Sequence, residues 1–421
     1  MKPLFCSAII VLLSAISASA QAQYSVLYSF GSVANDGNFP NGGLLFDSAG
    51  NIYGTTQRGG AGSSCNFGCG SIFELSPSAD GTWSETVLYS FCSLADCADG
   101  RAPAAGLISD ASGNLYGTTT LGGTSTKCGG GCGTVFELSP PTVPGGSWTE
   151  AVLLSFLTGL NDGANPNGRL TWDAEGNLYG TTLEGGLGVG SVFELSPVQG
   201  AGWAAYNLYA FCADGPPKCP DGFAPMAGVS FDKSGNLYGT NSQGGAEGDW
   251  GVVYQLSPPL AGGAWTETTL YAFEGKSGGD PFSEVNFDAT GKMYVTAFQG
   301  KGEGECGSVV RLTPEAAGAE EAAHYLFLPA GIACNPAAGV FLDSSDGTLY
   351  GTSETAGALG AGNIYQIKGE RGRVLYTFCS QSGCADGLTP EGSLVEHDRK
   401  LYSTTTKGGA YGQGVVFQLA P

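Results

Sequence analysis

The sequence predicts an all-β fold, a seven-bladed β-propeller with four antiparallel strands in each blade. Two observations carry this prediction: a short phrase with a central tyrosine recurs seven times, and each repeat holds four strand-like runs. The tyrosines are Tyr53, Tyr116, Tyr179, Tyr238, Tyr294, Tyr350 and Tyr402, at spacings of 63, 63, 59, 56, 56 and 52 residues. A repeat of this length indicates a unit that cannot bury its own apolar face and must pack against its neighbours.

The four runs of the first repeat are Gly43–Asp47, Asn51–Thr56, Ser71–Ser76 and Glu85–Phe91. They are rich in β-branched and aromatic residues and are bounded by Gly, Pro, Asn and Asp, as strands are. No segment after the first 22 residues has a helical period over a dozen residues, and we expect the Ala-rich piece Glu315–Ala323 to be a loop. Four such strands repeated seven times describe a propeller.

The two ends of the chain predict how the ring closes. Tyr24–Phe30 resembles the fourth strand of the later repeats, and the chain stops after Val415–Leu419, which is a third strand. The N-terminal strand can therefore complete the last blade and cover an edge that would otherwise stay open. A linear array would instead need a capping repeat at each end, and the sequence has none.

Residues 1–22 read as a secretory signal peptide, because Lys2 is followed by an apolar run from Leu4 to Ile16 and then by small residues. The apolar run is too short to span a membrane. We expect residues 23–421 to form a single propeller domain that is monomeric and exported, either extracellular or retained in the periplasm or at the cell surface. The formal net charge of −21 excludes nucleic acid as a partner.

Twelve of the 13 cysteines remain after removal of the signal peptide, and an even number in an exported chain indicates disulfides. Short spacings predict five local pairs, and two cysteines are left for a longer-range pair. The predicted pairs are Cys65–Cys69, Cys92–Cys97, Cys128–Cys132, Cys212–Cys219, Cys379–Cys384 and Cys306–Cys334. Zinc is the competing interpretation, but the spacings vary and the chain has only two histidines, so no metal site is expected.

Strand order assigns the cysteines to one face of the ring. Neighbouring strands are antiparallel, so the loops between the second and third strands lie on the same face as the loops between blades. All twelve cysteines fall in or beside these two kinds of loop. We call this side the stapled face; the short Asp-x-x-Gly-Asn turns, which begin at Asp47 in the first repeat, lie on the opposite face.

One phrase carries a family resemblance. Asp99-Gly100-Arg101-Ala102-Pro103, Gly106-Leu107, Gly113–Thr119, Gly122-Gly123 and Gly133–Leu138 together resemble the bacterial GloVer (Gloeobacter/Verrucomicrobium-type) tandem repeat. The resemblance covers essentially the whole chain after the signal peptide and is weakest in the fifth and sixth repeats. It implies a secreted or surface-displayed repeat protein, and it provides no catalytic residues.

Two groups of residues on the stapled face are candidates for ligand binding. Aromatic side chains in these loops would stack on sugar rings or anchor a protein partner: Phe39, Phe67, Phe223, Trp250, Phe282 and Tyr411. Aspartates that open Asp-Gly-x-x-Pro precede the innermost strands, so symmetry predicts an acidic ring at the channel mouth: Asp36, Asp99, Asp162, Asp221 and Asp386. For both groups a structural role, in packing and in turns, is the alternative.

Calcium at the acidic ring or at the Asp-x-x-Gly-Asn turns is the alternative that the residue types offer, but we prefer a role in turns for these aspartates and expect no cofactor. The seven tyrosines are expected to pack between blades. A Ser-His-Asp triad is not expected, because His324 and His397 both fall away from the stapled face.

We therefore expect a non-catalytic binding or scaffold propeller with a glycan or protein partner on the stapled face. A carbohydrate-active enzyme, either a glycoside hydrolase or a polysaccharide lyase using channel-mouth carboxylates, is the alternative. A surface protein without a specific ligand is the third hypothesis.

Overall fold

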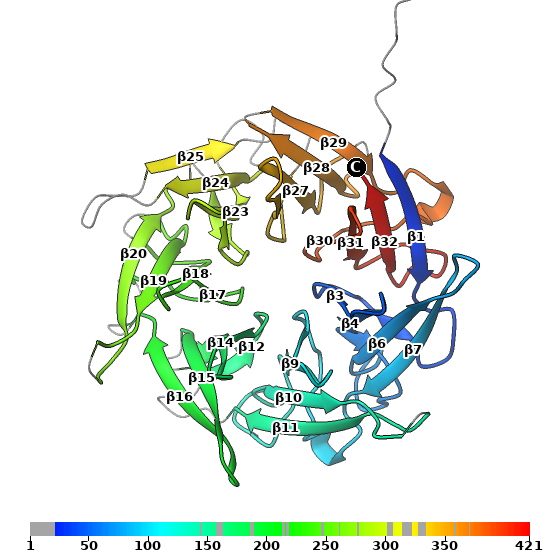
Figure 1. Cartoon of the computed structure of the whole chain (residues 1–421), viewed down its shortest axis with the longest axis horizontal. Coiled ribbons are helices and arrows are strands. Elements are labelled where there is room, and N and C mark those ends of the chain that lie inside the picture. Colours follow the sequence, from blue (N-terminus) through cyan, green and yellow to red (C-terminus); the bar gives the residue numbers. More distant parts are fainter. Residues whose placement is uncertain are drawn as a thin grey trace, which may run out of the picture.

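The computed structural model shows seven small antiparallel sheets arranged as blades around a central axis (Figure 1). It describes residues 22–421 apart from 144, 157–162, 186–188, 213–214, 216–218, 246–247, 261, 276–277, 301–305, 314–321, 327–333, 358 and 370. Almost all of the expected signal peptide lies outside these residues. Within them there is no α-helix, and no helix is long and apolar enough to cross a membrane. The predicted seven-bladed propeller is confirmed.

Each blade contains four strands that run in order from the axis outward, as the sequence predicts. Blades 1 to 4 comprise β3 (Leu45–Phe46), β4 (Ile52–Thr56), β6 (Ser71–Pro77), β7 (Trp83–Ser90); β8 (Ile108–Ser109), β9 (Leu115–Thr119), β10 (Thr134–Ser139), β11 (Thr149–Ser155); β13 (Thr171–Trp172), β14 (Leu178–Gly185), β15 (Ser191–Val198), β16 (Gly202–Ala210); and β17 (Ser230–Phe231), β18 (Leu237–Asn241), β19 (Val252–Ser257), β20 (Thr266–Ala272).

Blades 5 to 7 comprise β22 (Asn286–Phe287), β23 (Met293–Gln299), β24 (Ser308–Thr313), β25 (Ala322–Leu326); β26 (Phe341–Asp343), β27 (Thr348–Ser353), β28 (Asn363–Lys368), β29 (Arg371–Thr377); and β30 (Val395–His397), β31 (Lys400–Thr405), β32 (Val415–Ala420), β1 (Gln23–Ser29). The short strands β2 (Gly37–Asn38), β5 (Arg58–Gly59), β12 (Gly163–Pro166) and β21 (Gly279–Pro281) lie in the connections. The end of the Ala-rich piece expected to be a loop, residues 322–323, belongs to β25.

The N-terminal strand closes the ring, as predicted. β1 pairs antiparallel with β32, from Gln23 opposite Ala420 to Ser29 opposite Val415. In Figure 1 the blue β1 lies on the outside of the red β32. The ring of Tyr24 also stacks on Tyr376 of blade 6, with ring centroids 3.8 Å apart. The same strand therefore completes one blade and contacts its neighbour.

The repeated tyrosines pack between blades. Tyr116 of blade 2 packs edge to face on Trp172 of blade 3, with ring centroids 4.9 Å apart. Tyr179 of blade 3 packs in the same way on Phe231 of blade 4, at 5.0 Å. The hydroxyl of Tyr179 donates a hydrogen bond to Asp173 at 3.0 Å. The same bond to the turn aspartate occurs in blades 1, 2, 4 and 5. In blades 1 to 5 the tyrosine therefore also holds the turn of its own blade.

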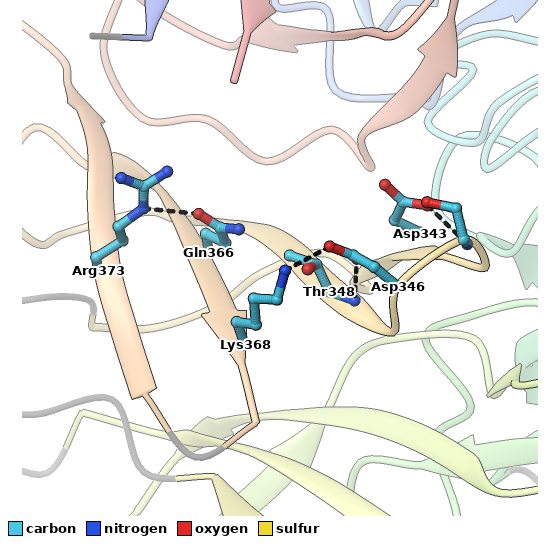
Figure 2. Close-up of polar contacts among 7 residues, drawn as sticks. Asp343, Asp346, Thr348, Gln366, Lys368 and Arg373 are labelled. Carbon is cyan, nitrogen blue, oxygen red and sulfur yellow. Dashed lines mark hydrogen bonds and ion pairs between the residues drawn. The ribbon is translucent and has the colours of Figure 1, made fainter. Parts of the chain in front are cut away.

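Blade 6 departs from this pattern on the face opposite the disulfides (Figure 2). Its turn contains a second aspartate, Asp346, which accepts a hydrogen bond from the Thr348 backbone and pairs with Lys368 at 2.6 Å. On the outer strands, Arg373 donates to Gln366 at 2.7 Å. Lys368 is 63% exposed, so its ion pair contributes little to stability.

One joint recurs between all seven pairs of neighbouring blades. The residue before the proline that recurs in each repeat has a left-handed backbone, with φ between 51° and 63°, and donates its N–H to a carbonyl of the preceding blade. The donor–acceptor pairs, at 2.8–3.2 Å, are Phe39–Gln413, Ala102–Cys69, Asn165–Cys132, Ala224–Val189, Asp280–Trp250, Asn335–Cys306 and Thr389–Ala361. A glycine follows each acceptor, and the proline ring lies directly over it. At Gly133, for example, an added Cβ would lie 2.6 Å from Pro166 Cδ.

The six disulfides have the predicted pairing. Five close loops of 4 to 7 residues, and Cys306–Cys334 links residues 28 apart. This last bond stands at an inter-blade joint, because Cys306 provides the acceptor carbonyl for the residue that follows Cys334. Several disulfides in one chain are typical of an oxidising compartment outside the cytoplasm.

The joint predicts a large effect of a single methyl group. In Gly133→Ala the new Cβ would meet both Pro166 and the Thr119 carbonyl, and φ is +94°, so we expect a loss of about 3 kcal/mol or more in the free energy of unfolding. The measurement is chemical denaturation followed by tryptophan fluorescence.

Gly113→Ala is the matched control, because φ is +83° there but nothing lies within 4 Å of the added Cβ. It should cost only about 1 kcal/mol, the strain of the backbone alone. Equal losses in the two variants would show that the inter-blade contact does not matter.

Candidate functional site

A cavity of about 830 Å³ lies on the axis of the ring. Its wall is formed by the segments that follow the joint prolines, just before the innermost strands. The lining segments are Asn41–Gly43, Ala104–Gly106, Asn167–Arg169, Met226–Gly228, Phe282–Glu284 and Ala337–Gly339, with Glu391 and Ser393 from blade 7. Threonines on the second strands fix this wall from the preceding blade; Thr55, for example, donates to the Ala105 carbonyl at 2.9 Å. We call this space the axial cavity.

The lining is small in most blades and large or charged in a few. The third residue after the proline is glycine in blades 1, 2, 4 and 6, but it is Arg169 in blade 3, Glu284 in blade 5 and Ser393 in blade 7. The side chains of these three residues occupy space on the cavity wall that stays open where the other blades have glycine. The cavity is therefore asymmetric although the fold around it is nearly sevenfold.

Arg169 and Glu284 meet across blade 4. Arg169 Nε lies 3.9 Å from Glu284 Oε1. Gly228 stands between them, and a Cβ there would come within 3.1 Å of the same carboxylate oxygen. Burial raises the pKa of Glu284, and the nearby guanidinium only partly opposes this shift. The pair places one positive and one negative group on the cavity wall.

Two carboxylates lie near each other between blades 6 and 7. Burial raises the pKa of Glu391, and the neighbouring carboxylate of Glu354 raises it further. The hydroxyl of Thr406 donates to Glu391 at 3.1 Å. Glu354 follows strand β27 directly and so lies toward the stapled-face end of the cavity, together with Gln57 and Phe298. This end of the cavity is acidic.

Two of the six predicted aromatic residues line the axial cavity. Phe39 packs against the guanidinium of Arg58, 4.9 Å from the ring centroid, and Phe282 packs against Phe298 with centroids 5.0 Å apart. Both rings are half-buried. They combine an aromatic face with neighbouring acids and amides, a lining typical of small-ligand sites.

The other four predicted aromatics lie elsewhere. Trp250 is half-buried and packs over Gly275 and Gly279 at the joint to blade 5. Phe223 packs on the core of blades 3 and 4. Phe67 and Tyr411 are 76% and 56% exposed, on the loops of blades 1 and 7. Phe67 lines a second, open hollow of about 450 Å³ that does not reach the axis.

The aspartates expected around the channel mouth lie away from it. None of Asp36, Asp99, Asp221 and Asp386 lines the axial cavity, and Asp162 lies outside the described residues. Asp99 accepts hydrogen bonds from the hydroxyl of Tyr89 on the outermost strand at 2.8 Å and from the Ser93 and Leu94 backbone. Symmetry predicted these side chains at the inner strand. The Asp-Gly segment instead lies near the outer strand that precedes it, where Asp99 contacts Tyr89.

The remaining aspartates of this set have the same partners. Asp36 accepts from Tyr28 at 2.9 Å, Asp221 from Tyr209 at 3.1 Å and Asp386 from Tyr376 at 2.7 Å. Burial opposes the ionisation of Asp386, but hydrogen bonds from Tyr376 and Ser380 outweigh it and lower the pKa. With donors already in place, these carboxylates tie outer strands to loops. Their predicted role in binding a ligand stays a prediction.

Metal coordination has one geometric candidate. Among the described residues, only the sulfurs of Cys65, Cys69, Cys92 and Cys97 form a group of three or more His, Cys, Asp or Glu ligand atoms close enough to share an ion. The turn aspartates do not: Asp47 already accepts hydrogen bonds from Ala49, Asn51 and Tyr53.

Sequence reasoning missed the charged residues of the axial cavity: Arg169, Glu284, Glu354 and Glu391. A signal for three of them was present, because Arg169 and Glu284 replace glycines, and Glu391 replaces a neutral residue, at fixed places after the joint proline. Aligning the seven units at that proline would have found them. The contact of Arg169 with Glu284 across blade 4 requires the ring itself.

The fold and this cavity define a propeller with a polar axial site, a class that contains many functions. Comparison with family models gives a more specific result. The Gloeobacter/Verrucomicrobia repeat model matches residues 15–144, 129–303 and 283–421. The chain belongs to this repeat family, which confirms the resemblance seen in its sequence.

Two solved structures are similar in shape. PorZ, a surface component of the type-IX secretion system of Porphyromonas gingivalis, aligns with a TM-score of 0.51 and 12% identity over 92% of this chain and 48% of PorZ. A Thermus thermophilus protein provisionally assigned as an oxidoreductase (glucose dehydrogenase) aligns with a TM-score of 0.43 and 16% identity, over 84% of this chain and 98% of that one. At these identities the first likeness supports the fold alone. No curated protein matches the chain.

Three glutamates on outer strands predict how stability depends on pH. Burial, together with a nearby aspartate, raises the pKa of Glu85, Glu150 and Glu267 to about 7. The folded protein thus holds these protons more tightly than the unfolded chain, so stability present near pH 4.5 is lost as the pH rises through 7. We expect Glu85→Gln/Glu150→Gln/Glu267→Gln to be more stable than the wild type at pH 8, by about 1 kcal/mol per residue after solvent screening, and similar to it at pH 5.

The measurement is urea denaturation between pH 5 and pH 8. Glu175→Gln/Glu184→Gln/Glu274→Gln changes the net charge equally at exposed positions and is the control. The same gain at pH 8 in both triple variants would attribute the effect to net charge and contradict the prediction.

Proposed function

We propose that the protein is an exported, non-catalytic binding propeller that takes a glycan into the axial cavity from the stapled face. The observation that carries this proposal is the asymmetric lining of the cavity, where aromatic, acidic and amide side chains replace the small residues of the repeat. A propeller with a structural role alone would not need these larger and charged side chains on its cavity wall.

The dimensions favour a glycan over a protein surface. Cavities of about 300–1,000 Å³ are typical of small-ligand sites, whereas protein partners bury about 800 Å² on each side of a broader interface. Half-buried Phe39 and Phe282 offer ring faces for a sugar, and Asn41, Asn167 and the glutamates offer hydrogen-bond donors and acceptors. The end of an oligosaccharide chain fits both requirements.

Charge narrows the class of glycan. Arg169 is paired with Glu284, and the stapled-face end of the cavity holds two carboxylates, Glu354 and Glu391, which the charge of Lys407 offsets only in part. Uronate or sulfated chains would be repelled there and by the net charge of −21. Neutral or amine-bearing oligosaccharides are the expected ligands.

Substitutions in the cavity and on the loops test where the ligand binds. We expect Phe282→Ala and Glu391→Gln to weaken binding of a glycan identified on an array by about tenfold or more, because each removes a contact in the enclosed site. Phe67→Ala and Tyr411→Ala should leave the dissociation constant unchanged, because both rings are exposed outside the axial cavity.

Isothermal titration calorimetry gives the constants, and circular dichroism checks that each variant is folded. The reverse pattern, with loss of binding only in the loop variants, would place the site on the loops. An array with no bound neutral or amino glycan would contradict the proposal itself.

One observation supports a carbohydrate-active enzyme as a second candidate. Glu391 and Glu354 are neighbours, and the pKa of one is raised by burial and by the other. A carboxyl group with a raised pKa beside a second carboxyl group is the kind of pair that glycoside hydrolases use as acid and as nucleophile or base.

For this candidate we expect release of reducing ends from a polysaccharide, abolished in Glu391→Gln and in Glu354→Gln and retained in Glu175→Gln, which changes an exposed turn residue. Binding without any release of reducing ends would leave the binding propeller as the function.

A further inference from the structure

Four cysteine sulfurs of blade 1 form one cluster. Sγ atoms of Cys65, Cys69, Cys92 and Cys97 all lie within 4.8 Å of one another, although they belong to two separate disulfides. The first pair lies in the loop between β4 and β6, and the second in the connection to blade 2. Both loops are on the stapled face, and blade 1 brings them together.

Such a cluster occurs once in the part of the chain that the structure describes. The loop pair Cys128–Cys132 has no second pair beside it, and neither has Cys379–Cys384, which is spaced like Cys92–Cys97. The chain therefore contains disulfides of the same spacing both with a second disulfide beside them and without one. They are internal controls for any property that needs four sulfurs.

The arrangement is close to that of a tetrathiolate metal site. Zinc binds cysteine sulfur at about 2.3 Å in a tetrahedron, so its four sulfurs lie about 3.8 Å apart. In blade 1 all four sulfurs lie within 4.8 Å of one another, so once the two bonds are reduced, separation of the two sulfurs within each pair is the main change that such a site requires. The Cys-x3-Cys and Cys-x4-Cys spacings each provide a local chelating pair. Cys69 and Cys97 are buried, while Cys65 and Cys92 are half-buried.

A positively charged side chain lies beside the cluster. Arg101 Nη1 lies 3.8 Å from Cys65 Sγ. Four thiolates around a divalent ion carry a net charge of −2, which a guanidinium at this distance offsets in part. Soft sulfur ligands select zinc and related thiophilic ions over magnesium and calcium.

We propose that blade 1 is a tetrathiolate site that binds one Zn²⁺ when its two disulfides are reduced. Two equivalents of a dithiol reductant break the two S–S bonds and are themselves oxidised to disulfides. The four thiols then lose four protons as the zinc ion binds. In the oxidised state each disulfide closes its own loop, whereas in the reduced state one shared ion would join the two loops.

Alkylation mapped by mass spectrometry tests the proposal on the full chain. The protein is reduced with a phosphine in the presence of Zn²⁺ or of Mg²⁺ and treated with iodoacetamide. We expect Zn²⁺ to slow alkylation of Cys65, Cys69, Cys92 and Cys97 by at least tenfold relative to Mg²⁺. The cysteines of the isolated pairs, including Cys379 and Cys384, should react equally in both. Uniform reactivity of all twelve cysteines, or equal protection of the isolated pairs, would overturn the proposal.

Cobalt spectroscopy gives a second readout that does not depend on loss of function. One Co²⁺ per reduced chain should give the intense visible bands of a tetrahedral thiolate complex, and Zn²⁺ should displace it. Cys379→Ser/Cys384→Ser should keep these bands, and Cys92→Ser/Cys97→Ser should lose them. Unchanged bands in the second variant, or bands lost in both, would contradict a site made of these four residues.

Discussion

A single backbone hydrogen bond, made seven times, sets the geometry of this ring. Its donor is a residue with left-handed φ that precedes a proline, and its acceptor is a carbonyl in the preceding blade. A non-glycine residue in this conformation is strained, and the strain persists only where neighbouring contacts hold it. Here the proline ring on the facing glycine provides such a contact, as Pro166 does on Gly133.

The axial cavity is a direct product of this joint. Each joint proline is held against the facing glycine of the neighbouring blade. The residues that follow it therefore line the axial cavity. Thr55 and its equivalents then fix the next carbonyls. Backbone geometry is thus constant around the ring, and side chains such as Arg169 and Glu284 can change without moving it. A rigid wall with variable side chains is a suitable scaffold for a specific site.

The sequence predicted those features that depend on period and pairing. The spacing from Tyr53 to Tyr402 gave the number of blades, and the likeness of Tyr24–Phe30 to a fourth strand gave the closure, because both depend on local pattern alone. The disulfide pairing followed from short spacings and from loops that share a face. Element boundaries shifted by one or two residues: β3 covers only Leu45–Phe46 of the run expected over Gly43–Asp47.

The sequence was less informative about the site, for physical reasons. Asp99 was expected at the axis because it precedes an inner strand, but its carboxylate bonds Tyr89 on the outer one. Sequence position gives the order of the elements, but it does not give the distance of a loop residue from the axis. Glu391 and Glu354 are unremarkable among 38 acidic residues until the ring brings blades 6 and 7 together. The predicted Phe39 and Phe282 line the cavity, while Phe67 and Tyr411, from the same class of loop, point elsewhere.

The pairing of β1 with β32 also orders events during synthesis. Among the strands of the ring, the one that completes blade 7 comes before all the others in the chain, and its partner, Val415–Ala420, comes after them. Until that partner is made, Tyr24 and Val26 have no sheet to join, and the edge of blade 1 that blade 7 will cover is bare. The ring can therefore close only after all seven blades have been synthesised, and until then its strands form an open arc. Any factor that holds the first strand in an extended form until that step would speed folding without contacting the other six blades.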